Sequence, residues 1–90
     1  MKYVLTYRAS PDVAQKAPLH AAAHRAHWQE YLAAGTLLMV GPFEDPREGA
    51  MGVFTTREAA EDFAARDPFV LHGVAEEWHV RGWHEALVPS

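Results

Sequence analysis

The chain has 90 residues, of which 49% are hydrophobic and 22% charged, and its net charge is −4; this is the composition of one globular domain spanning residues 1–90, not of a disordered chain. The sequence has no cysteine and only eight scattered Lys and Arg residues, which excludes disulfides and thiolate chemistry and argues against nucleic acid as a partner. No segment resembles a signal peptide or a membrane span, so we expect a soluble, cytoplasmic protein with no membrane partner.

Strands and helices alternate in the predicted chain order. Residues 2–8 alternate in side-chain orientation as a strand does, and Pro18 opens a helix that runs to Ala34, with Gly35 as its stop. The remaining predicted elements are a strand at 37–40 broken at Gly41–Pro42, a strand at 50–55, a helix from a Thr55–Glu58 capping box to about Arg66, a further helical turn at 69–72 and a strand at 76–83.

This order predicts an α+β fold, a ferredoxin-like βαββαβ unit with an antiparallel sheet and both helices on one face. The segment from Leu37 to Val40 is apolar at successive positions, so the strand is apolar on both faces. Two short helices can cover only one face of the sheet. We therefore expect a homodimer in which a second copy covers the other face.

Three of the six histidines lie on the first predicted helix: His20, His24 and His27. On a helical wheel they form one stripe, which also includes Tyr31, and Arg25 and Gln29 lie opposite. The stripe is therefore predicted to face the sheet, and the alanines beside it leave room for a ligand.

Three interpretations of the stripe remain open. The histidines can be ordinary packed residues with backbone or side-chain partners. They can share a metal ion, because positions three and four apart lie on one helix face, but Ala21 stands where the zincin spacing has Glu, and no cysteine is available. We therefore expect no metal site. The third interpretation is general acid–base catalysis, with a carboxylate that fixes the tautomer of one imidazole.

Asp67 is the carboxylate that this third interpretation considers. Because Asp67 directly precedes Pro68, it is predicted to cap the next helical turn. One carboxylate oxygen can act as the cap while the other reaches an imidazole. Spacing alone cannot pair residues forty positions apart.

The sequence resembles the YCII-related family of small α/β proteins over nearly its whole length. The resemblance rests on short motifs in a fixed order: Ala26-His27, Ala34-Gly35, Leu37-Leu38, Gly41-Pro42-Phe43, Ala59 with Phe63, Asp67-Pro68-Phe69-Val70 and the segment Glu76 to Trp83. It implies a dimeric α/β barrel in which the sheets of two copies pack together. It also implies an active-site pair formed by a first-helix histidine and the Asp of Asp-Pro, here assigned to His27 and Asp67.

The family includes a dehydrochlorinase that acts on a chlorinated hydroxyquinol and is distantly similar to muconolactone isomerases. The resemblance therefore implies a cofactor-independent enzyme that performs proton transfer or elimination on a small molecule. We expect His27 and Asp67 to be catalytic and His24, Tyr31 and Arg81 to contact the substrate, Arg81 through forked hydrogen bonds to an anion. The alternative is a non-catalytic dimeric module that binds a small molecule or assists another protein.

Overall fold

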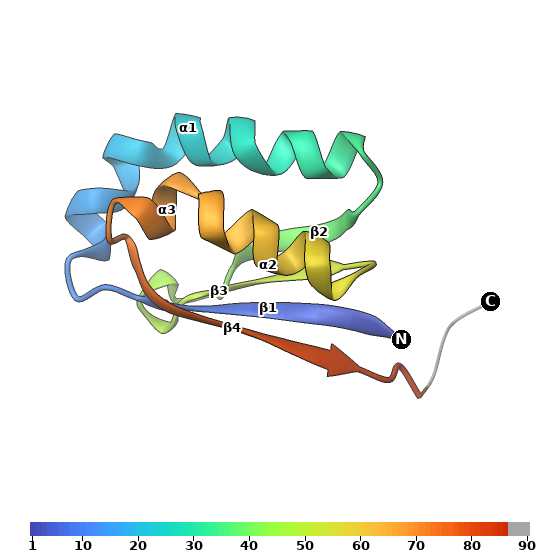
Figure 1. The fold of residues 1–90 in the computed structure, drawn as a ribbon. Helices are drawn as coiled ribbons and strands as arrows, with labels where there is room; N and C mark the ends of the chain where they lie inside the picture. Colours follow the sequence, from blue (N-terminus) through green and yellow to red (C-terminus); the bar gives the residue numbers. More distant parts are fainter. Residues whose placement is uncertain (87–90) are drawn as a thin grey trace.

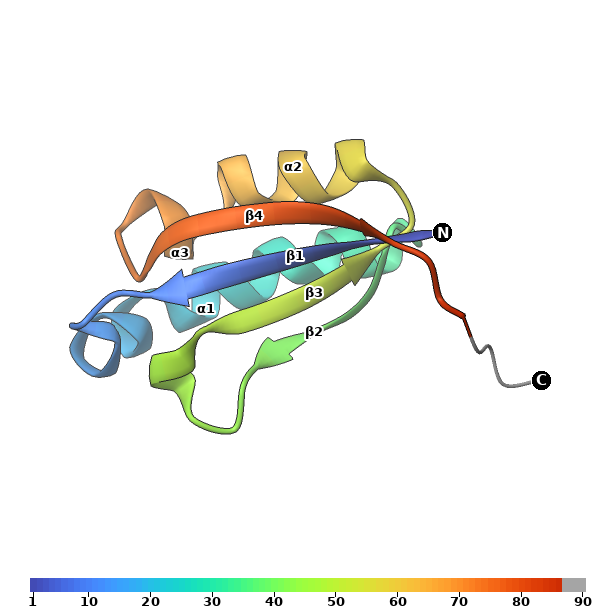
Figure 2. The ribbon, with the colours of Figure 1, turned by 90° about the horizontal axis from the view of Figure 1, so that it is seen from below.

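A computed structural model describes residues 1–86. Its eight elements, in chain order, are β1 (Lys2–Ala9), α1 (Val13–Ala33), β2 (Leu37–Pro42), the short 3₁₀ helix η1 (Pro46–Glu48), β3 (Ala50–Phe54), α2 (Arg57–Arg66), α3 (Pro68–Leu71) and β4 (Ala75–Trp83). The four strands form one antiparallel sheet in the order β2-β3-β1-β4. The helices lie on one face of this sheet (Figures 1 and 2). The predicted α+β, ferredoxin-like fold is therefore confirmed.

The register of the sheet decides which side chains face the helices. Leu5 of β1 pairs with Gly52 of β3 and with Val80 of β4, and Tyr7 pairs with Ala50 and Trp78. Leu5 and Tyr7 are buried, so these rows form the helix-facing side. The core lies between this side and α2, around the fully buried Phe54, Phe63 and Leu37. No residue of α1 is buried, because part of the space between α1 and the sheet is a cavity.

The first helix begins earlier than predicted. It starts at Val13, and Pro18 lies inside it. The prediction placed Pro18 in the first turn, where its missing N–H is harmless; inside a helix the same ring removes a hydrogen bond and bends the axis. Figure 1 shows the N-terminal turn of α1 set at an angle to the rest of the helix.

Two smaller boundaries also differ from the prediction. β2 continues through Gly41 to Pro42; it is an edge strand, where a proline needs no ladder partner. The cap of α2 is Thr56, whose side-chain oxygen accepts a hydrogen bond from the Ala59 N–H at 3.1 Å. The expected capping box between Thr55 and Glu58 is therefore wrong by one residue. The third residue after Thr56, where a capping box needs Glu or Gln, is Ala59.

Candidate active site

A cavity of about 370 Å³ lies between α1 and the helix-facing side of the sheet. Val13, Ala17, His24 and Trp28 line it from α1, Leu5, Tyr7, Val40, Ala50 and Gly52 line it from the sheet, and Phe69 lines it from α3. Several of these residues have small side chains or none, which is why the space is open. The predicted room for a ligand is present, but Ala17 borders it, whereas Ala21, Ala22 and Ala23 are exposed.

Asp67 lies behind this cavity and is completely buried. Its Oδ2 accepts a hydrogen bond from the Tyr7 hydroxyl at 2.6 Å, and its Oδ1 accepts one from the Phe69 N–H at 3.0 Å. Nδ1 of His24 lies 2.8 Å from the same Oδ1. The Tyr7 hydroxyl and the Phe69 N–H donate to Asp67, and because a carboxylate only accepts, the facing nitrogen of His24 is its third donor. The cap predicted for Asp67 is confirmed.

The local sequence explains why Asp67 is held so firmly. Asp67 joins the end of α2 to the start of α3, and Pro68 presets the first helical position. Tyr7 reaches the carboxylate from β1, on the helix-facing side. Burial, reinforced by the charge of Asp67 and their hydrogen bond, raises the pKa of Tyr7 well above its usual range. Tyr7 therefore stays a hydrogen-bond donor, and sequence analysis had given it no role.

His24 connects the buried carboxylate with the cavity. Its ring stacks on Phe69, with centroids 3.9 Å apart and planes 5° from parallel. Because Nδ1 faces a carboxylate, Nδ1 carries the proton and donates it. Nε2 is then the ring nitrogen left for a molecule in the cavity, which His24 lines. Its side chain is 18% exposed, as expected for a residue at the edge of an open pocket.

The expected pairing of His27 with Asp67 is wrong, because His24 occupies that place. Nε2 of His27 lies 2.9 Å from the Phe63 carbonyl oxygen, and its ring packs on the Phe63 ring with centroids 4.7 Å apart. A carbonyl only accepts, so His27 is protonated at Nε2. The two histidines are three residues apart and lie within one side of the helix. A helical wheel could not decide which of them reaches α3.

The remaining histidine of the stripe has a different neighbour. His20 stacks on His72, with ring centroids 4.1 Å apart. Each histidine of the stripe therefore packs on a separate residue of α2, α3 or the turn after α3.

Within residues 1–86, no three His, Cys, Asp or Glu side chains are grouped so that they could hold a metal ion. Nor is any helix in this range long and apolar enough to cross a membrane.

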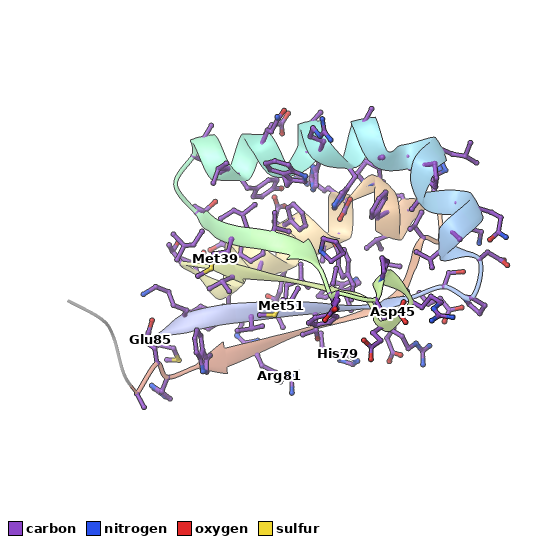
Figure 3. The ribbon with its side chains drawn as sticks, turned by 180° about the vertical axis from the view of Figure 1, so that it is seen from behind. Met39, Asp45, Met51, His79, Arg81 and Glu85 are labelled. Atoms are coloured by element: carbon purple, nitrogen blue, oxygen red, sulfur yellow. The ribbon has the colours of Figure 1, made fainter. Side chains whose placement is uncertain are left out.

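The structure places the other two predicted substrate contacts away from the cavity. Tyr31 donates a hydrogen bond to Oδ2 of Asp62 at 2.6 Å and borders a shallower groove near the end of α1. Burial and this hydrogen bond raise the pKa of Tyr31 to about 12. Arg81 is exposed, pairs with Val4 in the sheet and points away from the helices (Figure 3). Only His24 of the three lines the cavity.

Comparison with known proteins identifies the family. The model of the YCII-related domain matches residues 1–84. The chain is a member of the YCII-related family. No curated protein matches it.

This YCII-related chain also resembles a solved structure, the 5-chloro-2-hydroxyhydroquinone dehydrochlorinase TftG from Burkholderia phenoliruptrix AC1100, in complex with 2,5-dihydroxybenzoquinone. The two share 20% sequence identity and superpose with a TM-score of 0.75 over 93% of this chain and 94% of the other. At this identity the likeness establishes the fold.

Proposed function

We propose that this chain is a small enzyme that uses His24 and Asp67 to move a proton on a compact molecule in the cavity, without a cofactor. The observation that carries the proposal is the position of His24, between a fully buried carboxylate and an open cavity. A histidine of that kind is oriented by one ring nitrogen and reacts through the other. The fold shared with a dehydrochlorinase that binds a six-membered ring supports the proposal.

The reaction that this geometry supports best is an elimination or an isomerisation. Nε2 of His24 would take a proton from a hydroxyl or C–H group of the ligand, and Asp67 would stabilise the imidazolium that forms. In an elimination the leaving group departs as an anion and His24 returns its proton to water, so the ligand loses an acid such as HCl. In an isomerisation His24 returns the proton to another atom of the ligand. Tyr31 and Arg81 have no part in this scheme.

The test uses the substrate in the neighbour's name. We expect the protein to bind 5-chloro-2-hydroxyhydroquinone, measured by quenching of its tryptophan fluorescence, and to release chloride from it, measured against a protein-free control. Binding without chloride release, there and across a panel of chlorinated and lactone analogues, would favour the non-catalytic binding module.

We also propose that the chain forms a homodimer through the sheet face opposite the helices. The β-sheet register places Met39, Met51 and Val53 on that face, and Met39 is 64% exposed in the isolated chain. Oppositely charged side chains border this apolar area, with Arg8 on β1 contacting Glu76 and Glu77 on β4. The β2–β3 part of the sheet is therefore apolar on both faces, and its second face needs a cover.

Placing a charge in this face should separate the two copies. We expect the wild type to be a dimer at micromolar concentration by light scattering and Met39→Lys to be monomeric, because an unpaired ammonium would be buried in the interface. Leu32→Lys is the matched control: Leu32 is also an exposed apolar residue, 49% exposed, but it lies on α1. A wild-type monomer, or a Met39→Lys dimer, would contradict the proposal.

A further inference from the structure

We propose that the cavity selects uncharged, ring-sized molecules and rejects carboxylates and phosphates of the same size. The inference rests on the proposed function, because it takes the cavity beside His24 as the substrate site. It goes beyond that function by naming the chemical class of the ligand, and it follows from the charges and the volume of the cavity.

Within residues 1–86, the lining of the cavity includes no Lys or Arg side chain that could bind an anion. Among the described residues that line the cavity there is no Lys, Arg, Asp or Glu side chain, and the side chains with polar atoms are those of Tyr7, His24 and Trp28, whose indole N–H is an uncharged donor. The Tyr7 hydroxyl already donates its hydrogen bond to Asp67. A carboxylate entering this cavity would lose its water without gaining a charged partner, which is costly. A neutral hydroxyl or amide needs only one or two hydrogen bonds, and His24 Nε2 can supply one.

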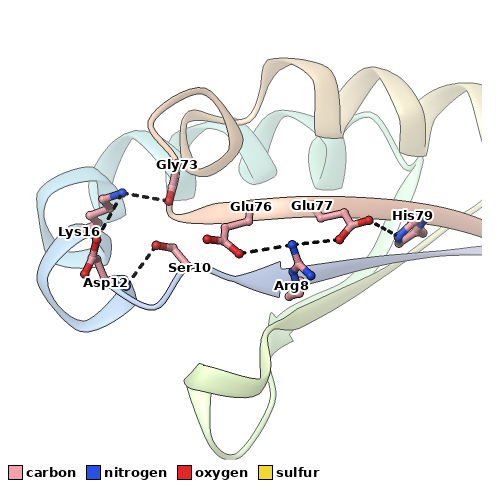
Figure 4. Close-up of polar contacts among 8 residues, drawn as sticks. All are labelled: Arg8, Ser10, Asp12, Lys16, Gly73, Glu76, Glu77 and His79. Atoms are coloured by element: carbon pink, nitrogen blue, oxygen red, sulfur yellow. Dashed lines mark hydrogen bonds and ion pairs between the residues drawn. The ribbon is translucent and has the colours of Figure 1, made fainter.

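The basic side chains of Arg8 and Lys16 already have other partners. Arg8 contacts Glu76 and Glu77, and Lys16 contacts the Gly73 carbonyl oxygen and the Asp12 carboxylate (Figure 4). Neither lines the cavity. Arg81, which sequence analysis assigned to an anionic substrate, points to the opposite face of the sheet.

The buried negative charge of Asp67 also disfavours an anionic ligand. Asp67 accepts three hydrogen bonds and is fully buried directly behind the His24 ring. Charges in a poorly solvated region interact more strongly than in water. While His24 is neutral, a second negative charge in the cavity would be repelled by this carboxylate, whereas an uncharged ligand of equal shape would not.

The volume of the cavity sets the size of the ligand. A cavity of about 150 Å³ already accepts benzene, so about 370 Å³ admits one ring with several substituents. Gly52 on the sheet and Ala17 on α1 leave this space open. A methyl group at Gly52 would lie 3.2 Å from the Phe54 ring and 3.6 Å from Val40, so neighbouring side chains already crowd this position and the cavity does not extend further there.

The experiment compares two probes that differ in charge and hardly in shape: 4-hydroxybenzamide, which is neutral, and 4-hydroxybenzoate, which is an anion. Binding to the wild-type protein is measured by calorimetry at about pH 8, where imidazoles are ordinarily neutral. We expect the amide to bind at least about tenfold more tightly than the carboxylate. Equal or tighter binding of the carboxylate would overturn the proposal, as would failure of both probes to bind.

A second comparison places the bound probe. Ala17→Leu extends a side chain into the cavity and should abolish binding of the amide, while Ala22→Leu makes the same change on an exposed position of α1 and should leave it unchanged. Amide binding that persists in a folded Ala17→Leu variant would overturn the assignment to this cavity. Chloride release is measured separately. Tighter binding of the amide without chloride release contradicts only the proposed function. Chloride release without a preference for the amide contradicts only this inference.

Discussion

Replacing His24 by alanine should lower kcat by about 10²–10⁴-fold, the usual contribution of a positioned acid–base group, while the protein remains folded. Tyr7 and Phe69 also contact Asp67 and line the cavity, but His24 is the residue among the three that has a ring nitrogen free to accept a proton from the ligand. Without the imidazole, no basic group is positioned beside the ligand to accept its proton. Because the ring lies at the edge of the core and is not fully buried, its loss should leave the far-ultraviolet circular dichroism spectrum unchanged.

His27→Ala is the matched control for this prediction. His27 is a histidine of the same helix, three residues away, but it donates to the Phe63 carbonyl and does not line the cavity. We expect its kcat to stay within about tenfold of the wild type. If His27→Ala caused the larger loss of rate at equal folding, the assignment of His24 would be wrong.

Replacing Asp67 by alanine should lower the free energy of unfolding by about 3–5 kcal/mol, a large part of the stability of a small domain. The change leaves the Tyr7 hydroxyl, the Phe69 N–H and the His24 Nδ1–H without their acceptor. Buried donors that lose their partner cost their full desolvation, and the side chain also leaves a void. Urea unfolding followed by circular dichroism measures the difference.

Asp62→Ala provides a control that differs mainly in burial. Asp62 also accepts a tyrosine hydroxyl at 2.6 Å, from Tyr31, and pairs with Arg66, but its side chain is 44% exposed. Water can replace the lost partner there, so we expect a loss of less than about 1 kcal/mol. Equal losses in the two variants would show that burial does not strengthen the Asp67 network.

Asp67→Asn separates the charge of Asp67 from its hydrogen bonds. The amide oxygen can replace Oδ1 and accept from His24 and Phe69, and the amide nitrogen can donate to the Tyr7 oxygen. The cap and the His24 tautomer are then kept, and the negative charge is removed. A fall in kcat with near wild-type stability would assign the effect of Asp67 to its charge.

The order of the elements could be predicted because local patterns determine it. The alternation in β1, the cap-and-proline pair at Asp67–Pro68 and the glycine stop at Gly35 all act over a few residues. Their predictions agree with the structure. The start of α1 could not be read in the same way, because Pro18 is compatible with both the first turn of a helix and a bend inside one.

The site depends on contacts between distant parts of the chain, and its details could not be predicted. The stripe on α1 indicated that histidines face inward, and the family resemblance indicated that one of them meets Asp67. Which one does depends on how α1 lies over α3, where Phe69 stacks on His24. Tyr7 gave no signal beyond an inward aromatic position on β1. The face on which Arg81 lies follows only from the register between β1 and β4.

Nitrogen NMR of the histidine rings in the free protein tests the orientation of His24 by Asp67 most directly, and it needs no substrate. At about pH 8, where imidazoles are ordinarily neutral, His24 should carry its proton on Nδ1, facing Asp67, and have an unprotonated Nε2. His27 should show the opposite tautomer, with its proton on Nε2 facing the Phe63 carbonyl. A His24 ring protonated on Nε2 and bare at Nδ1 would show that Asp67 does not orient His24 with a free nitrogen toward the cavity.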